Sequence, residues 1–351
     1  MTTTRKQPDK ILVIRMVSAG DALAIGLPAI RYFQQQLADA ELHVLSYGEG
    51  QKLLELAEPQ LRQLTLAAWP DDFFQAMEAF LGLAEQIIGQ AYSQIINLDT
   101  AFMPCFLARF LQDAGEPVRG NSLSKSIQQL LDEVRAQSLQ AEYVNNPAAY
   151  LHSSFIGMSR WQRPWWQSDY VPDGGYPEYY LKQCCGFSRL EMDLTIQLPA
   201  STAEHTSAGN LIALEVSQSE DGYAYPYPAE LTTELSAKGY TVWQVGDYQH
   251  DNQALLARLQ QSKLLISKAS AIKWLADAVG CPTLMISGAA EPKLYMPDYA
   301  TDVQTPCPRH SHLHSANSMV GTFACHCDDP QELADNIVAL LTDKPEESSH
   351  A

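Results

Sequence analysis

The sequence predicts an α/β protein built of two doubly wound domains that face each other across a cleft. Short apolar runs, typical of buried parallel strands, alternate with helical patterns in two separate series. A polar, small-residue segment at 200–209 separates the two series and is the best candidate for a linker. The chain of 351 residues is also longer than a single core usually accommodates.

The first predicted domain, 1–199, opens with a strand, a turn and a helix. The apolar, partly β-branched run at 11–14 is typical of a strand buried on both faces. We expect the helix to begin near Ala22, with an apolar face at Leu23, Leu27 and Ile30. Further strands are expected at 41–45 and 93–98, and further helices at 51–67, 71–91, 104–112 and 123–137.

The second predicted domain, 210–345, repeats this alternation. Strands are expected at 210–217, 240–245, 263–267 and 283–287, and helices at 228–238, 252–261, 270–279 and 330–341. Residues 346–351 form an acidic tail that we expect to be frayed.

The composition narrows the classes of partner. Hydrophobic residues make up 46% of the chain and charged residues 18%, as in a soluble globular protein. The net charge of −18 argues against nucleic acid or an anionic membrane surface as the main partner. No apolar run is long enough for an integral membrane segment, and the polar start of the chain lacks a secretory signal. We therefore expect a cytoplasmic location.

A polar turn follows the first strand and supplies the first candidate site. Ser18, Gly20 and Asp21 lie where ligands bind in doubly wound sheets, at the carboxyl end of a strand. Asp99 and Thr100, at the end of the third strand, are expected to face the same cleft. Asp21 is the leading catalytic candidate, with helix capping as its alternative role. Asp99 is the second candidate acid, with a turn or cap role as its alternative.

The segment 143–180 is crowded with aromatic residues, including Trp161, Trp165, Trp166 and Tyr170. Two interpretations compete. One is an irregular, packed excursion that covers the sheet, and the other is an aromatic platform for an acceptor sugar or peptide. Packing is the more common use of aromatic side chains, so the first interpretation is favoured.

The opening K-I-L-V-I-R-x-x-S-x-G-D, followed by Pro28, resembles the lipopolysaccharide heptosyltransferases, which have the GT-B fold of two Rossmann-like domains. Residues 264–288 are similar to that family's stretch ending A-x-G-x-P, strand, glycine. The details at 274–276 and 285–288 are closer to the protein-directed autotransporter heptosyltransferases. The segments at 307–310 and 323–325 also resemble the cysteine segment of that branch.

The resemblance implies an inverting transfer of heptose from ADP-heptose to a glycan or protein acceptor, with Asp21 as the base and no cofactor required for catalysis. It also implies a donor subsite in the second domain and leaves oligomerisation possible. Asp247, after the strand that ends at Val245, is a candidate for the nucleotide ribose, with a turn role as its alternative. The full candidate set for donor and nucleotide binding is Ser18, Gly20, Ser217, Ser219, Asp247, Lys268, Ser270 and Lys273.

The donor-side motifs depart from the family pattern. At 217–228 the family usually carries a lysine that pairs with the diphosphate, whereas this chain has Glu220 and Asp221. The family's D-[ST]-G-x-x-H aligns with 269–274, where only Ser270 matches. We hypothesise that Lys268 and Lys273 replace the lost cation. The main alternative function is a non-catalytic nucleotide- or sugar-binding module or partner subunit, and a third is another sugar-nucleotide enzyme, such as an epimerase.

Cysteine and histidine are concentrated near the C-terminus. The seven cysteines are an odd number, and in a reducing compartment most should be buried thiols or metal ligands. Cys307, His310, Cys325 and Cys327 are ligand types that zinc or iron favours, although their spacing is irregular. A structural zinc or iron ion held by these four residues is therefore a candidate cofactor.

Overall fold

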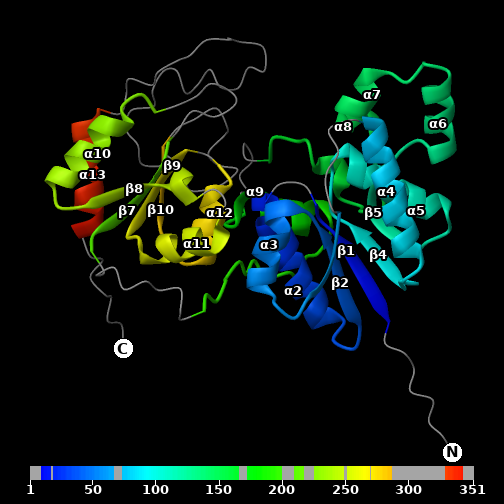
Figure 1. Cartoon of the computed structure of the whole chain (residues 1–351), viewed down its shortest axis with the longest axis horizontal. Helices are drawn as coiled ribbons and strands as arrows, with labels where there is room; N and C mark the ends of the chain where they lie inside the picture. Colours follow the sequence, from blue (N-terminus) through cyan, green and yellow to red (C-terminus); the bar gives the residue numbers. More distant parts are fainter. Residues whose placement is uncertain are drawn as a thin grey trace, which may run out of the picture. The chain divides into compact units, whose positions relative to one another are not determined.

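The computed structural model describes residues 9–16, 19–66, 73–165, 172–199, 209–216, 225–248, 251–268, 270–286 and 329–342. The chain divides into two compact units, Met1–Leu194 and Thr195–Ala351 (Figure 1). Residues 200–208 of the predicted linker and the predicted tail at 346–351 lie outside the described residues.

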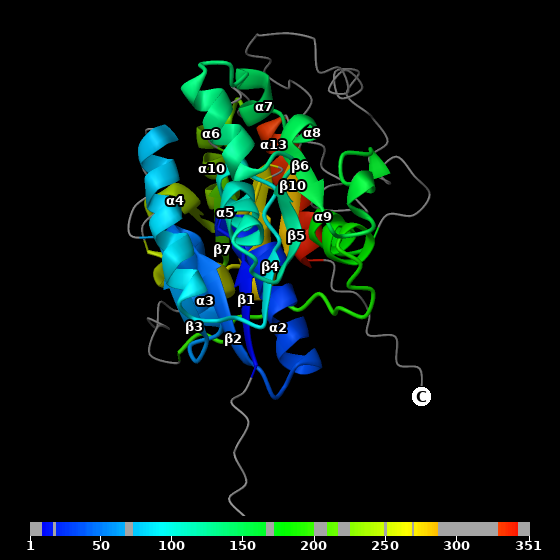
Figure 2. The same ribbon diagram turned by 90° about the vertical axis from the view of Figure 1, so that its right-hand side faces the viewer.

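The first unit is built on a six-stranded sheet with the order β3-β2-β1-β4-β5-β6. Five of its strands are parallel, and β6 pairs antiparallel with β5 at one edge. Figure 2 shows β1 and β4 next to each other near the middle of this sheet. The strands are β1 (Lys10–Ile14), β2 (Glu41–Ser46), β3 (Arg62–Thr65), β4 (Gln94–Asn97), β5 (Val118–Leu123) and β6 (Leu151–Ser153).

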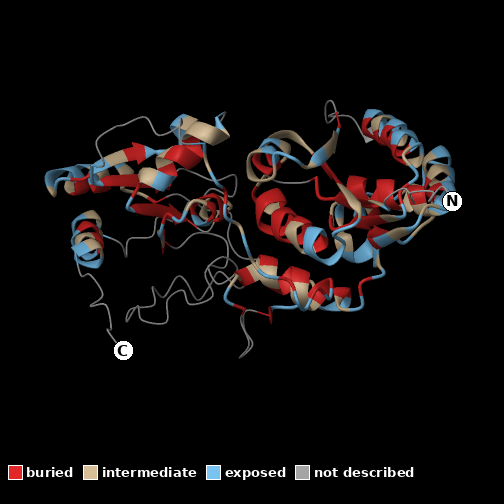
Figure 3. Ribbon diagram, turned by 90° about the horizontal axis from the view of Figure 1, so that it is seen from below, coloured by how far each residue is buried: buried red, intermediate tan, exposed pale blue. Residues whose placement is uncertain are grey.

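Helices pack against this sheet and close its core. Leu12 and Ile14 of β1 share one apolar cluster with Phe80 and Phe106 of the helices α4 and α5. Figure 3 colours the chain by the burial of each residue. The helical segments are α1 (Ala19–Asp21), η1 (Ala22–Gly26), α2 (Leu27–Gln36), α3 (Gly48–Ala57), α4 (Phe73–Ile88), α5 (Phe102–Asp113), α6 (Ile127–Arg135), α7 (Ala141–Asn145), α8 (Pro147–Tyr150), η2 (Met158–Arg160), α9 (Gly175–Glu178) and η4 (Tyr179–Cys184).

The second unit has a four-stranded parallel sheet with the order β10-β9-β7-β8. Its core joins strand residues such as Ile212 and Ile266 to Leu231 of α10 and Ile337 of α13. The strands are β7 (Leu211–Glu215), β8 (Thr241–Gln244), β9 (Leu264–Lys268) and β10 (Thr283–Ile286). The helices are α10 (Pro228–Ala237), η6 (Val245–Tyr248), α11 (Asn252–Gln261), α12 (Ile272–Ala278) and α13 (Pro330–Thr342).

The predicted α/β class and the doubly wound pattern of both halves are confirmed, but some elements differ. The helix predicted at 51–67 is confirmed only to Ala57, where α3 ends, and its second half is wrong because β3 follows at Arg62–Thr65. β3 is a short edge strand with no fully buried residue, so it lacks an apolar signal. The helix predicted from 123 begins instead at Ile127, after a capping box at Ser126.

The opening helix contains a π-helical segment that the sequence pattern did not predict. Residues Ala22–Gly26 form η1, and the Leu27 N–H donates to both Ala22 O and Leu23 O. Pro28 follows inside the same helical run and has no N–H to donate to the preceding turn. The widened turn accommodates this proline without ending the helix.

Gly120 interrupts β5, and its backbone explains why that strand was not predicted. It has a φ of +101°, and an added Cβ would lie 2.3 Å from the carbonyl oxygen of Asn97. Only glycine combines this backbone conformation with so close an approach. The β5–β4 pairing, and hence the position of Asn97, depends on this residue.

We expect Gly120→Ala to lower the free energy of unfolding by more than about 2 kcal/mol, because a positive φ and a backbone clash act together. Gly82→Ala is the matched control: Gly82 lies within α4, and an added Cβ there would have no neighbour within 4 Å. This control should gain about 0.5–1 kcal/mol, since alanine favours helix. Urea unfolding of the three proteins measures both effects, and equal stabilities would contradict the expectation.

Candidate functional site

The candidate site lies where the strand order of the first sheet reverses, at the carboxyl ends of β1 and β4. Ile14 pairs with Asn97, and the Leu98 N–H donates to Ile14 O at 3.0 Å. The residues that follow the two strands, Arg15 and Asp99, are therefore neighbours. Ligands bind at such switch points in open α/β sheets.

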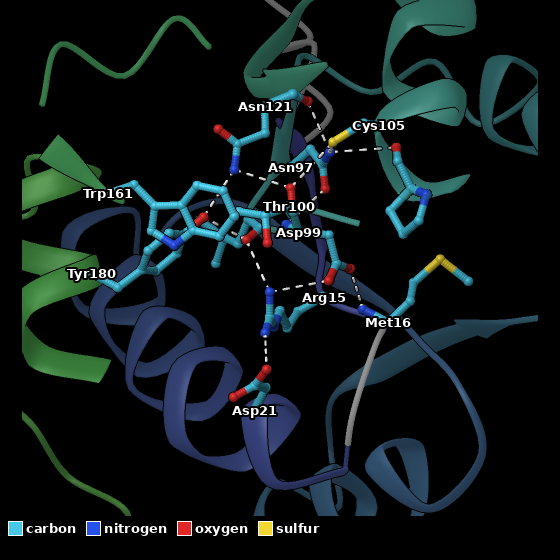
Figure 4. A network of polar contacts seen from close by, with 12 residues as sticks. Arg15, Met16, Asp21, Asn97, Asp99, Thr100, Cys105, Asn121, Trp161 and Tyr180 are labelled. Atoms are coloured by element: carbon cyan, nitrogen blue, oxygen red, sulfur yellow. Dashed lines mark hydrogen bonds and ion pairs between the residues drawn. The ribbon is translucent and has the colours of Figure 1, made fainter. Parts of the chain in front are cut away.

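Arg15 joins two carboxylates at this point (Figure 4). Its Nη2 lies 2.6 Å from Asp21 Oδ2, and its Nη1 lies 3.0 Å from Asp99 Oδ1. Nη1 also donates to the carbonyl oxygen of Leu98 at 3.2 Å. The Arg15 and Asp99 side chains are only 5% and 1% exposed, whereas that of Asp21 is 35% exposed. Arg15 thus connects a buried carboxylate to one that reaches the surface.

The positive charge of the buried Arg15 guanidinium is compensated by the carboxylates of Asp99 and Asp21. Burial alone would lower the pKa of the Arg15 guanidinium, but Asp99 and Asp21 together raise that pKa above its ordinary value. Arg15 is therefore charged at every physiological pH. Removing one partner would leave the other charge buried without compensation.

The loop that carries Asp99 is held from several directions. The Met16 N–H donates to the Asp99 carboxylate, and the Asp99 N–H donates to Asn97 Oδ1 at 3.0 Å. From β5, Asn121 Nδ2 donates to Asp99 O at 3.0 Å and to the Tyr180 hydroxyl at 2.8 Å. The Tyr180 hydroxyl in turn donates to Leu98 O at 2.7 Å. Asp99 therefore anchors Arg15 from within the protein, and its buried carboxylate does not present itself to a ligand.

The alternative role of Asp21 as a helix cap is not supported. The helix that contains it begins at Ala19, and Asp21 has the helical angles φ −73° and ψ −31°. Its side chain makes no capping hydrogen bond and pairs instead with Arg15. Gly20 is buried in the same turn, and Ser18 lies outside the described residues.

Most aromatic side chains of 143–180 that the structure describes are packed, as favoured from the sequence. Trp165 is 6% exposed and stacks on Tyr179 with ring centroids 4.7 Å apart, and Tyr180 is fully buried. Trp161 differs: it is only partly buried, and its Nε1 donates to the Tyr176 hydroxyl at 2.9 Å. Trp166 and Tyr170 lie outside the described residues.

Tyr176 lies in α9, which contacts η1, the helical segment that follows Asp21. Burial raises the pKa of its hydroxyl, the hydrogen bond from Trp161 and the charge of Arg15 lower it, and the charge of Asp21 raises it further. The hydroxyl therefore stays protonated through the physiological range. Trp161 and Tyr176 thus form an uncharged, hydrogen-bonded aromatic pair.

In the second unit, the predicted donor residues lie at the carboxyl edge of the sheet. Asp247 is exposed in η6, directly after β8. Lys268 ends β9 and is 6% exposed, and Ser270 Oγ lies 3.4 Å from Ser267 Oγ. Ser217 and Ser219 would follow β7 and lie outside the described residues.

Lys273 forms an ion pair within its own helix. Its Nζ donates to the carboxylate of Asp277, one turn further along α12, and lies 4.8 Å from the centroid of the Trp274 ring. The structure therefore brings Asp247, Lys268 and Ser270 to one edge of the sheet, with the charge of Lys273 already balanced by a carboxylate.

The predicted metal ligands Cys307, His310, Cys325 and Cys327 lie outside the described residues, so that site stays a prediction. Within the described part of the chain, no three histidine, cysteine, aspartate or glutamate side chains are grouped for a metal ion. Four cysteines there are buried free thiols: Cys105, Cys184, Cys185 and Cys281. Across the same residues, no helix has the length and apolar character needed to span a bilayer.

Comparison with known proteins identifies the fold. No protein-family model matches the chain, and no curated protein has significant sequence similarity to it. A family 9 glycosyltransferase from Veillonella parvula superimposes with a TM-score of 0.59 at 13% identity, over 95% of this chain and 97% of that one. The ADP-heptose lipopolysaccharide heptosyltransferase II of E. coli gives 0.56 at 14% identity, over 95% and 98%.

The chain shares the two-domain fold of these glycosyltransferases. A third structure, E. coli heptosyltransferase WaaC with ADP, gives a TM-score of 0.51 at 14% identity, over 82% of this chain and 89% of that one. The resemblance predicted from the opening motif and from 264–288 is confirmed at the level of this GT-B fold.

Arg15 is the site residue that sequence reasoning missed. It belongs to the motif K-I-L-V-I-R, but the motif by itself suggested no role for it. The signal was present, because a charged residue directly after four consecutive buried apolar positions needs compensating carboxylates nearby. Asp21 and Asp99, which follow two neighbouring strands, were the carboxylates available to pair with Arg15.

We expect Arg15→Met to destabilise the protein by about 3–5 kcal/mol, because it leaves the Asp99 carboxylate buried and uncompensated. The double variant Arg15→Met/Asp99→Asn should lose less than the sum of its single variants, since the unpaired charge is gone. Arg135→Met is the control, because its pair with Asp132 is 72% and 60% exposed. That control should change stability by no more than about 0.5 kcal/mol. Additive losses in denaturant unfolding would contradict the coupling.

Proposed function

We propose that this protein is an inverting glycosyltransferase. It transfers heptose, or a related sugar, from a nucleotide sugar of the ADP-heptose type to a hydroxyl of a glycan or protein acceptor. One observation carries the proposal: Asp21 is a partly exposed carboxylate, held at a sheet switch point by a buried arginine, in a chain with the heptosyltransferase fold.

In this reaction the acceptor oxygen attacks the anomeric carbon while the bond from that carbon to the diphosphate breaks. Asp21 accepts the proton of the attacking hydroxyl, and the nucleoside diphosphate departs with the electron pair of the broken bond. A single displacement inverts the anomeric configuration. Arg15 acts as a positioning residue, because its bond to Asp21 Oδ2 fixes the direction in which the carboxylate faces.

The donor would bind at the carboxyl edge of the second sheet. There Lys268 supplies positive charge, Ser270 a hydroxyl and Asp247 an acceptor for ribose hydroxyls, with Ser217 and Ser219 following β7. WaaC, one of the similar structures, was solved with ADP, which supports an adenosine diphosphate as the leaving group.

The non-catalytic alternative is supported by a specific observation. Lys273, one of two lysines suggested to replace the family's missing cation, is already paired with Asp277. A donor site left with Lys268 alone would bind a diphosphate weakly. Under this alternative, the chain binds a nucleotide or sugar, or serves as a partner subunit, without transfer.

We expect Asp21→Asn to lower sugar transfer by about 10²–10⁴-fold, because the amide cannot accept the proton. Release of ADP from ADP-heptose, with lipopolysaccharide core oligosaccharide and unfolded autotransporter peptide offered as acceptors, measures transfer. The affinity for ADP should stay unchanged. Unaltered transfer would remove Asp21 as the base, and ADP binding without transfer in the parent protein would favour the non-catalytic alternative.

We expect Lys268→Ala to weaken ADP binding about tenfold, because the charge nearest the carboxyl end of β9 is lost. Lys263→Ala is the matched control, since the exposed Lys263 directly precedes the other end of β9 and its Nζ donates to Asn210 Oδ1. Thermal shift with ADP, ADP-heptose, UDP and UDP-glucose reports the affinities. Equal effects of the two substitutions would contradict a donor site at this edge, and no shift with any nucleotide would favour the partner-subunit alternative.

A further inference from the structure

The strand β6 forms one edge of the first sheet, and its pairing with β5 determines which of its backbone groups are already bonded. Two bonds flank this short strand. The Ser124 N–H donates to Tyr150 O at 2.7 Å, and the Ser154 N–H donates to Gly120 O at 3.0 Å. Along an antiparallel ladder, pairs of residues that exchange backbone bonds alternate with pairs that do not. The two flanking bonds therefore fix the pattern for the residues between them.

Ser122 and His152 lie opposite each other midway between these bonds, so they form the next bonded pair. Leu151 and Ser153, the neighbours of His152, consequently direct their backbone groups away from β5. The Leu151 N–H donates to Pro147 O. Among the described residues, none bonds the Leu151 carbonyl oxygen, the Ser153 N–H or the Ser153 carbonyl oxygen. Three backbone groups on the outer side of β6 are therefore available to a further strand.

A hollow of about 480 Å³ adjoins this open edge. Leu151 and Ser153 line the hollow, whereas His152 between them does not, as expected when alternate residues of a strand share one face. The apolar part of the lining includes Trp161 and Ile156, and Ile156 is fully exposed. A strand added to β6 would therefore carry alternate side chains toward an apolar hollow.

The turn after β6, which forms much of the hollow, is held in place. A Cβ on Gly157 would lie 1.9 Å from the carbonyl oxygen of Gln183, so this turn packs directly against the backbone of η4. Phe155 is 3% exposed, and its N–H donates to Ser153 Oγ at 3.1 Å. The edge and the hollow are therefore preformed, and a bound segment would lose little free energy in ordering them.

Positive charge lies beside the hollow, although the net charge of the chain is −18. Arg160 and Arg163 are exposed in the turn that forms the hollow, and residues 143–165 contain no carboxylate. The Arg119 guanidinium lies 5.9 Å from the centroid of the Phe155 ring, and Phe155 lines the hollow. None of these three arginines forms an ion pair with a described carboxylate. A complementary partner therefore has an apolar side chain for the hollow and carboxylates on either side of it.

We propose that the open edge of β6 is a docking site for an extended, acidic segment of a partner protein. The segment adds to the sheet as a further strand, places one apolar side chain in the hollow and carries carboxylates for Arg119, Arg160 and Arg163. Docking at this edge is separate from the proposed sugar transfer and needs neither donor nor acceptor.

Antiparallel pairing suits this edge. Ser153 can exchange both of its backbone bonds with one residue of the segment, while the Leu151 carbonyl oxygen accepts from the residue two positions away. Residues opposite each other in an antiparallel pair have their side chains on the same face. The segment residues that bond β6 are therefore the ones whose side chains reach the hollow.

Isothermal titration calorimetry of the full chain with the peptide acetyl-Glu-Glu-Thr-Leu-Thr-Glu-Glu-amide tests the site. We expect saturable binding that weakens about tenfold when the leucine nitrogen is methylated, because one donated backbone bond is lost. Methylation of the next threonine nitrogen, whose N–H points away from β6, is the matched control and should leave binding unchanged. Replacement of the four glutamates by lysines should abolish binding.

Matching substitutions in the protein test the same bonds from the other side. Ser153→Pro removes the outward N–H but keeps the bonds between His152 and β5, and proline is tolerated in this way on edge strands. It should weaken peptide binding about tenfold. Ser153→Ala is its control, because it loses only the bond from the Phe155 N–H to the side chain. Ile156→Ser should also weaken binding, whereas Leu340→Ser, which alters an exposed apolar residue of α13, should not.

Amide hydrogen exchange of the parent protein, followed by NMR, requires no variant to fold. The Ser153 amide should exchange rapidly in the chain alone and slowly with the acidic peptide bound. The His152 amide, which bonds β5, should exchange slowly in both states.

Four outcomes would overturn the inference: no saturable binding of the acidic peptide, equal binding of the lysine peptide, tolerance of the methylated leucine, or a Ser153 amide that is already protected in the chain alone. Protection of that amide would show that the edge is already covered. If the protection grew with protein concentration, the occupant would be a second copy of the chain. If it did not, the occupant would be another part of the same chain.

Discussion

The buried guanidinium of Arg15 is the interaction on which the candidate site depends. A charge 5% exposed within a parallel sheet is tolerated only because two carboxylates and a carbonyl oxygen surround it. One of these carboxylates, Asp99, is locked inside the protein by backbone donors. The other, Asp21, lies on the first helical turn and reaches the surface. The buried Arg15 guanidinium therefore fixes the orientation of the exposed Asp21 carboxylate. A general base needs such a fixed orientation toward the proton that it accepts.

The need to satisfy buried polar groups also explains why side chains from several elements bond the loop at Leu98 and Asp99. Asn97 and Asn121 come from neighbouring strands, and Tyr180 comes from η4, yet all three bond the backbone between Leu98 and Asp99. Buried polar groups of this kind are stable only when their hydrogen bonds are made together. The cluster therefore ties β1, β4, β5 and η4 into one rigid frame around Asp21.

The two units differ in how much of a site they present. The first unit offers a partly exposed carboxylate, Asp21, that is held by a buried positioning arginine, Arg15. The second offers Lys268, Ser270 and Asp247 at the carboxyl edge of its sheet, with Lys273 paired to Asp277. The candidate base is thus the better-defined half of the proposed reaction, and donor recognition is the half in which this chain departs from the family pattern.

The sequence alone determined the α/β class, the repeated alternation of strands and helices, and the place of Asp21 after the first strand, because apolar periodicity and turn residues are local signals. It could not supply β3 or β6, which are short edge strands without an apolar run, or β5, whose Gly120 and polar residues hide it. Only the tertiary structure decided that Arg15 joins Asp21 to Asp99. Arg15 and Asp99 are 84 positions apart along the chain (15 to 99) and meet through strand register, which no local pattern encodes.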